Sequence, residues 1–136
     1  MEVITAKSAG FCFGVKRAMD KVEEQINTAN GKKIYTYGPI IHNEEVVKKL
    51  EARGVITIRD DESLDNIDGS GNDIVVIRSH GVAKSTYQKL LEKGFVIADA
   101  TCPFVKRIHN IVSEESQKGN YWNVHIYTKN LMVNKF

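Results

Sequence analysis

The run Asp73-Ile74-Val75-Val76-Ile77, followed directly by Arg78-Ser79-His80-Gly81, decides the fold of this 136-residue chain. Its four consecutive β-branched residues are typical of a strand that is buried on both faces in a parallel sheet. The residues that follow, about 84–93, have the apolar spacing of a helix, which Gly94 ends. We therefore expect a strand, a loop that carries His80, and a helix.

The same order of strand, loop and helix recurs along the chain. Short apolar runs predict strands over residues 3–6, 33–37, 55–58 and 95–98, and helical spacing predicts helices over 15–27, 44–53 and 104–117. The acidic, glycine-rich stretch 59–72 is expected to be a surface connection with at most one helical turn. This alternation indicates an α/β fold, with a mainly parallel sheet and flanking helices.

Each predicted helix has an apolar stripe that should face the core. The residues expected there are Val15, Ala18, Met19, Val22 and Ile26 in the first helix, Val46, Val47 and Leu50 in the second, Tyr87, Leu90 and Leu91 in the third, and Val105, Ile108, Ile111 and Val112 in the fourth.

Composition narrows the class of protein. A net charge of +2 and a pI near 8.5 are too mild to indicate a nucleic-acid partner. No run approaches the ~20 apolar residues that span a bilayer, and the N-terminus lacks the apolar core of a signal peptide. We expect a cytoplasmic protein without a membrane partner, in which two distant cysteines are free thiols or metal ligands rather than a disulfide.

Four reactive residues, Cys12, His42, His80 and Cys102, each lie in a loop that leads into a predicted helix. Ligands of open α/β sheets bind outside the carboxyl ends of the strands, where such loops meet. Glycines beside these residues permit the turns and close approaches that a ligand site needs. We expect the four to form a functional site, whereas His109, in mid-helix, is expected to be a surface or packing residue.

The residue types alone leave several chemistries open. Two thiolates and two imidazoles could hold a tetrahedral zinc ion, and a Cys-His pair could serve nucleophilic catalysis. Two cysteines from separate loops could instead be part of an iron–sulfur ligand set. Helix N-termini that converge on one cleft would suit a phosphate-bearing ligand.

Four motifs resemble those of one known family, and they occur in its order. They are Ala9-Gly10-Phe11-Cys12-Phe13-Gly14-Val15, Tyr37-Gly38-Pro39-Ile40-Ile41-His42-Asn43, Arg78-Ser79-His80-Gly81-Val82 and Asp99-Ala100-Thr101-Cys102-Pro103-Phe104-Val105. They look like motifs of the 4-hydroxy-3-methylbut-2-enyl diphosphate reductases, the LytB or IspH family. The resemblance covers about residues 1–119.

The resemblance implies an oxidoreductase of non-mevalonate isoprenoid biosynthesis, with three α/β lobes around a [4Fe-4S] cluster held by three cysteines. Such an enzyme reductively removes the allylic hydroxyl of its diphosphate substrate, giving isopentenyl and dimethylallyl diphosphate. Ferredoxin or flavodoxin delivers the electrons. By motif, Cys12 and Cys102 would be two cluster ligands, and His42 and His80 would bind the diphosphate.

The same resemblance divides the chain into a first lobe (1–100), the start of a second lobe (101–120) and a tail (121–136). The tail departs from the family pattern: Leu131, Met132 and Val133 stand near the position of the family's His-Pro-Glu motif, and His125 has no motif around it. The family's proton-donating glutamate and its third cysteine have no counterpart here. We expect a truncated or frame-shifted member that is inactive alone, with a non-catalytic remnant or zinc-binding module as the alternative.

Overall fold

The computed structural model describes residues 3–4, 9–59, 63–64, 67 and 72–118. Four strands form one sheet in the order β2-β1-β3-β4, and every strand pair is parallel. The strands are β1 (Ile34–Tyr37), β2 (Val55–Ile58), β3 (Ile74–Ile77) and β4 (Val96–Asp99). The predicted α/β class and parallel sheet are confirmed, with strand boundaries within one residue of expectation.

Strand β3 lies in the interior of the sheet, and all four of its residues are buried. Ile74 pairs with Ile34 on one side and with Val96 on the other. The side chains of a strand alternate between the two faces of a sheet, so β3 contributes to two separate cores. The continuous β-branched run therefore marks a strand covered on both faces.

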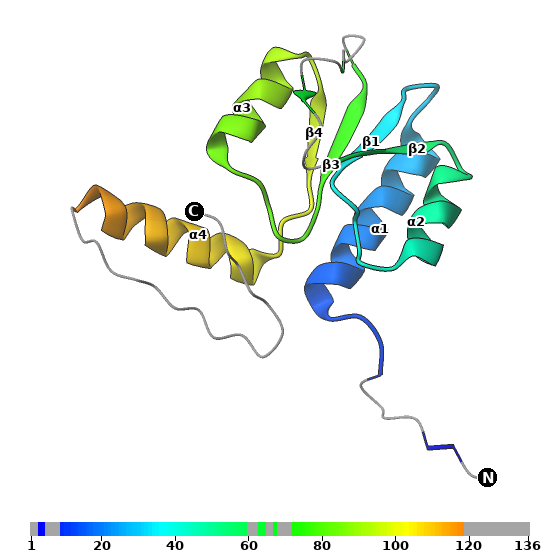
Figure 1. Cartoon of the computed structure of the whole chain (residues 1–136), viewed down its shortest axis with the longest axis horizontal. Helices are drawn as coiled ribbons and strands as arrows, with labels where there is room; N and C mark the ends of the chain where they lie inside the picture. The colour runs from blue at the N-terminus through cyan, green and yellow to red at the C-terminus, as the bar shows by residue number, and fades with distance from the viewer. Residues whose placement is uncertain (1–2, 5–8, 60–62, 65–66, 68–71, 119–136) are drawn as a thin grey trace.

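Helices α1 (Phe13–Thr28) and α2 (Glu44–Glu51) cover one face of the sheet (Figure 1). The core beneath them includes Ala18 and Val22, both fully buried, together with Leu50 and Val76. Met19 and Ile26 pack against its margin. The predicted inward stripe of the first helix is thus confirmed.

Helix α3 (Lys84–Glu92) covers the opposite face (Figure 1). Leu90 is fully buried there, and the rings of Tyr35 and Phe95 meet edge to face with centroids 5.3 Å apart. The prediction that Tyr87 and Leu91 also point inward was wrong, because they are 37% and 46% exposed. Leu90 alone of this stripe is buried in the core on this face of the sheet, and Tyr87 and Leu91 both lie to one side of it around the helix.

Helix α4 (Pro103–Gln117) runs away from the sheet (Figure 1). None of its residues is buried, and Ile111 is 49% exposed. Val105, Ile108 and Val112 are half-buried. The prediction that this stripe is buried was therefore wrong within the described part of the chain, since α4 diverges from the sheet and packs no residue fully against it.

The first predicted strand, residues 3–6, is not confirmed. Val3 and Ile4 belong to no strand and are 78% and 85% exposed. Residues 5–6 and the whole tail, 121–136, lie outside the described residues. Of the connection 59–72, only Arg59, residues 63–64, Ile67 and Asn72 are described; Leu64 is buried, and its carbonyl oxygen accepts from the N–H of Ile67 at 3.2 Å, at the place where a helical turn was expected.

Candidate functional site

The carboxyl ends of β1, β3 and β4, three adjacent strands, carry three of the four predicted site residues. His42 lies between β1 and α2, His80 lies between β3 and α3, and Cys102 caps the N-terminus of α4 after β4. The one-edge arrangement expected from the sequence holds for these three. Cys12 follows no strand in the described part of the chain: it stands at the N-cap position of α1, and Gly14 in the first turn of that helix abuts Cys102.

The two histidines come together. Their ring centroids lie 6.2 Å apart, with 31° between the ring planes. His42 is exposed and His80 is half-buried. Both loops turn at a glycine with positive φ, at Gly38 (71°) and Gly81 (73°), where a side chain would be strained. The result is a pair of imidazoles on neighbouring loops, close enough to bind one ligand together.

Cys102 is held next to the His80 loop. Its backbone N–H donates to the carbonyl oxygen of Ser79 at 2.9 Å. Cys102 is 9% exposed and Ser79 is 5% exposed. The thiol at residue 102 and the imidazole at residue 80 thus project from two loops that are hydrogen-bonded to each other in a buried setting.

Cys12 has the opposite surroundings. It is exposed and stands between Phe11 and Phe13, which are 54% and 62% exposed. Its backbone carbonyl accepts the first helical bond of α1 from the N–H of Lys16 at 2.9 Å. An exposed thiol flanked by two exposed aromatic rings forms an apolar, accessible face at the start of α1.

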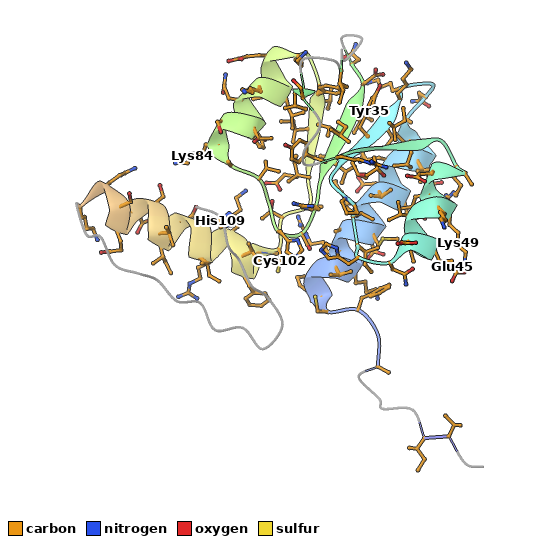
Figure 2. All side chains as sticks on the ribbon, in the orientation of Figure 1. Tyr35, Glu45, Lys49, Lys84, Cys102 and His109 are labelled. Carbon is orange, nitrogen blue, oxygen red and sulfur yellow. The ribbon has the colours of Figure 1, made fainter. Side chains whose placement is uncertain are left out.

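Two contacts join α1 to residues 101–102, which we call the Cys102 segment. Neither contact was predicted from the sequence. The guanidinium Nη1 of Arg17 donates to the carbonyl oxygen of Thr101 at 3.0 Å, and Gly14 abuts the side chain of Cys102. Figure 2 shows Cys102 at the start of α4, close to the first turns of α1. Such contacts between distant segments leave no periodic signal in the sequence, although the lack of a side chain at residue 14 hinted at a close approach.

Asp99, at the end of β4, organises the turn into α4 and was also missed. Its carboxylate accepts from the backbone N–H of Thr101 at 2.8 Å and from Lys106 Nζ at 3.2 Å. Burial raises the pKa of this carboxyl, but the hydrogen bonds from Thr101 and Lys106 outweigh it and hold the pKa below its usual range. The ionised carboxylate therefore ties β4 to the first turns of α4.

An open cavity of about 250 Å³ lies between α3 and α4. Its lining includes Lys84, Tyr87, Asp99, Lys106 and His109. Figure 2 labels two of these, Lys84 on α3 and His109 on α4. The Nζ of Lys84 donates to Ser113 Oγ at 3.3 Å across the two helices. His109 is half-buried here, which is compatible with the expected surface or packing role. The cavity is lined by none of the four predicted site residues.

The donor set fits part of an iron–sulfur site and gives no support to the zinc alternative. Among the residues whose placement is described, no three His, Cys, Asp or Glu side chains come together as a metal site. Cys12, Cys102, His42 and His80 are therefore not gathered as a tetrahedral set. Cys12 and Cys102 do stand at the N-cap positions of two helices that approach each other at Gly14, and thiolate sulfur is the ligand that iron–sulfur clusters use. They fit two corners of such a site, with further ligands from elsewhere.

The chain is a parallel α/β lobe that carries His42, His80 and Cys102 at one edge of its sheet, with Cys12 at the start of the adjoining helix α1. The sequence profile described as LytB protein matches residues 3–130, and the chain belongs to the LytB family. The match continues past residue 120, beyond the last family motif recognised from the sequence.

Two curated relatives illustrate the match. The 4-hydroxy-3-methylbut-2-enyl diphosphate reductase of Caldanaerobacter subterraneus is 48% identical over 119 residues, covering 88% of this chain and 40% of the relative. The reductase of Aquifex aeolicus is 41% identical over 130 residues, covering 96% and 42%. The chain thus spans about two fifths of the length of the curated relatives it matches.

Solved structures agree with this assignment. One is titled as (E)-4-hydroxy-3-methyl-but-2-enyl diphosphate reductase, the terminal enzyme of the non-mevalonate pathway; it has a TM-score of 0.69 and 41% identity, covering 88% of this chain and 40% of its own. The reductase of Plasmodium falciparum gives a TM-score of 0.73 at 31% identity, covering 88% and 37%. In both comparisons this chain corresponds to part of a larger α/β protein.

No helix in the part of the chain described is long and apolar enough to cross a membrane.

Proposed function

We propose that this chain forms the first lobe (residues 1–100) and the start of the second lobe (101–120) of a 4-hydroxy-3-methylbut-2-enyl diphosphate reductase. The reaction would remove the allylic hydroxyl of the substrate as water, with two electrons and two protons, and give isopentenyl and dimethylallyl diphosphate. The observation that carries the proposal is the meeting of His42 and His80, 6.2 Å apart, beside the buried loop of Cys102. A diphosphate pocket next to a metal-ligating thiol is what this reaction requires.

In this proposal Cys12 and Cys102 are two of the three cysteine ligands of a [4Fe-4S] cluster. When bound, the cluster would pass electrons, received singly from ferredoxin or flavodoxin, to the substrate. The chain's own contribution is to present one accessible and one buried sulfur from two adjoining helix starts. The exposed rings of Phe11 and Phe13 would exclude water on the side of Cys12 once further lobes cover them.

His42 and His80 would bind the diphosphate. An imidazole presents N–H donors to phosphate oxygens, and these bonds are strengthened by the charge of the anion. Because the two rings come from separate loops, each can contact a different oxygen of one anion. The reaction also needs a proton donor, for which we assign no residue of this chain, so we expect no turnover from the chain alone. We place the protein in the cytoplasm, where ferredoxins and flavodoxins supply electrons.

Inorganic pyrophosphate tests the proposed histidine pair. We expect the chain to bind it in a calorimetric titration, and His42→Ala or His80→Ala to weaken binding at least about tenfold, the loss of one charge-assisted hydrogen bond. Lys32→Ala, which removes an exposed positive charge next to the amino end of β1, is the control and should leave binding unchanged. Equal binding by all four proteins would contradict the assignment of His42 and His80.

Anaerobic purification tests the proposed thiols. We expect the chain, reconstituted with iron and sulfide, to turn brown and to hold both elements, and Cys12→Ser and Cys102→Ser to lose them. A colourless protein with stoichiometric zinc would contradict the cluster. Turnover of the allylic diphosphate with a reduced viologen would contradict the expectation that the chain is inactive alone.

A further inference from the structure

Gly14 is the second residue of α1, where the backbone itself has no need of glycine. Its φ lies outside the left-handed region, and glycine is a poorer helix former than alanine. A Cβ at residue 14 would lie 2.8 Å from Cys102 Sγ and 2.9 Å from Cys102 Cβ. Rotation of the thiol relieves only the first contact, since Cβ moves only with the backbone. Cys102 therefore occupies the space that a side chain at residue 14 would need.

Arg17 lies one turn further along the same face of α1. Its Nη1 donates to the carbonyl oxygen of Thr101 at 3.0 Å in a partly buried setting. Thr101 is itself buried and directly precedes Cys102. Helix α1 thus contacts the Cys102 segment twice, at the side chain of residue 102 and at the peptide before it.

The opposite side of the segment is fixed as well. The hydrogen bond from Cys102 N–H to the Ser79 carbonyl anchors it to the loop after β3. Cys102 therefore cannot retreat from α1 without breaking a buried bond. Cys12 is the N-cap residue of α1 and moves with that helix. The packing of α1 against Cys102 consequently determines the distance between the sulfur atoms of Cys12 and Cys102.

We infer that Gly14 and Arg17 are positioning residues that set the spacing of the Cys12 and Cys102 thiols for a shared metal centre. This inference rests on the proposed role of the two cysteines. Neither residue would contact the metal. Gly14 allows Cys102 to pack closely against the first turn of α1, and the Arg17 hydrogen bond to Thr101 fixes the position of α1 relative to residues 101–102. A cluster presents its ligand sites at fixed separations, so a displaced helix would misplace one thiol relative to the other.

The alkylation rate of Cys102 in the reduced, metal-free chain measures how closely α1 packs against this residue. In the wild-type chain we expect Cys12 to react rapidly and Cys102 to react slowly, because one is exposed and the other buried. Gly14→Ala should increase the alkylation rate of Cys102 at least about tenfold, and Arg17→Gln should increase it severalfold. Lys16→Gln removes an exposed charge from the same turn of α1 and should leave the rate of Cys102 unchanged.

Cadmium titration measures the spacing, since a soft metal ion favours thiolate ligands. The probe is Cd²⁺ alone, followed by its sulfur-to-metal charge-transfer absorption. We expect Gly14→Ala and Arg17→Gln to lower the affinity at least about tenfold, Arg17→Lys to recover part of the loss, and Lys16→Gln to match the wild-type chain. After iron and sulfide reconstitution, the two variants should also show an altered electron paramagnetic resonance spectrum upon reduction.

The possible results separate this inference from the proposed function. If Cys12→Ser binds Cd²⁺ as tightly as the wild-type chain, the two thiols share no metal and both proposals are overturned. If the wild-type chain binds Cd²⁺ through both thiols and the two positioning variants bind it equally well, only the positioning role is overturned. Faster alkylation of Cys102 with unchanged Cd²⁺ affinity also overturns it, because packing alone would then be affected. Should Gly14→Ala fail to fold, Arg17→Gln and its Lys16→Gln control decide the question.

Discussion

Helices α1 and α4 both begin at a cysteine, have 16 and 15 residues, and carry an apolar stripe, yet their surroundings differ. Helix α1 packs on the sheet and buries Ala18 and Val22 completely. Helix α4 buries no residue and leaves Phe104 70% exposed. An amphipathic stripe therefore indicates that a helix packs against a partner, but it does not indicate which part of the protein supplies that partner.

The difference also bears on the division of the chain. A helix that has an apolar stripe but buries none of its residues against the lobe is expected where a second lobe begins. This supports our placement of a boundary near residue 100, with α4 as the first element after it. The apolar stripe of α4 would then be covered by segments of the second lobe.

The largest expected difference in stability is between a substitution on the apolar stripe of α1 and one on the apolar stripe of α4. Val22→Ala should lower the free energy of unfolding by about 2 kcal/mol, because two buried methyl groups are lost and a cavity is left behind. Ile111→Ala, on the half-exposed stripe of α4, should change it by less than ~0.5 kcal/mol. Urea denaturation followed by circular dichroism measures both, and equal losses would show that α4 is packed as firmly as α1.

The next effect concerns the attachment of α4 to the sheet. Asp99→Ala should cost about 1–2 kcal/mol, because the Thr101 N–H and Lys106 lose a partly buried charged partner. Its matched control is Glu24→Ala, which removes an exposed ion pair with Lys21 on α1 and should cost at most ~0.5 kcal/mol. The same urea measurement applies, and a larger loss for Glu24→Ala would contradict this account.

The pH dependence of this attachment has a definite sign. The pKa of Asp99 is lower in the folded protein than its ordinary value, so its contribution is fully present above that ordinary value and is lost as pH falls through the folded pKa. The stability difference between the wild-type chain and Asp99→Ala should therefore shrink as pH falls from about 5 toward 2. Urea midpoints at a series of pH values measure it, and a difference that grows on acidification would refute the assignment.

The smallest effect concerns the helix starts. Neither Cys12 nor Cys102 makes a side-chain cap hydrogen bond, whereas Asn43 at the start of α2 accepts from the N–H of Val46 at 3.2 Å. Asn43→Ala should cost about 1 kcal/mol. Cys12→Ser should instead raise stability by about 0.5 kcal/mol, because serine is a favoured cap and residue 12 is exposed. Thermal melts measure both, and a loss of stability in Cys12→Ser would give the thiol a structural role in the metal-free chain.

Sequence patterns predicted the parallel sheet, its strands and the loops of His42, His80 and Cys102, because periodicity and turn residues act locally. They failed for the apolar runs at Val3-Ile4 and along α4, since burial depends on what lies opposite. They could not predict the bond from Arg17 to Thr101, which joins residues 84 positions apart. Gly14 was recognised as part of a motif, but its role depends on a side chain that only the folded chain brings near.

The all-parallel register carries a consequence for how the chain folds. Each strand pair joins residues between 21 and 40 positions apart, so no hairpin can nucleate the sheet and chain closure precedes every pairing. The pairing of β1 with β3 also brings the loops of His42 and His80 side by side. The ligand pocket and the sheet should therefore appear in one kinetic step, and during refolding the protection of Cys102 from alkylation would report the time at which both are complete.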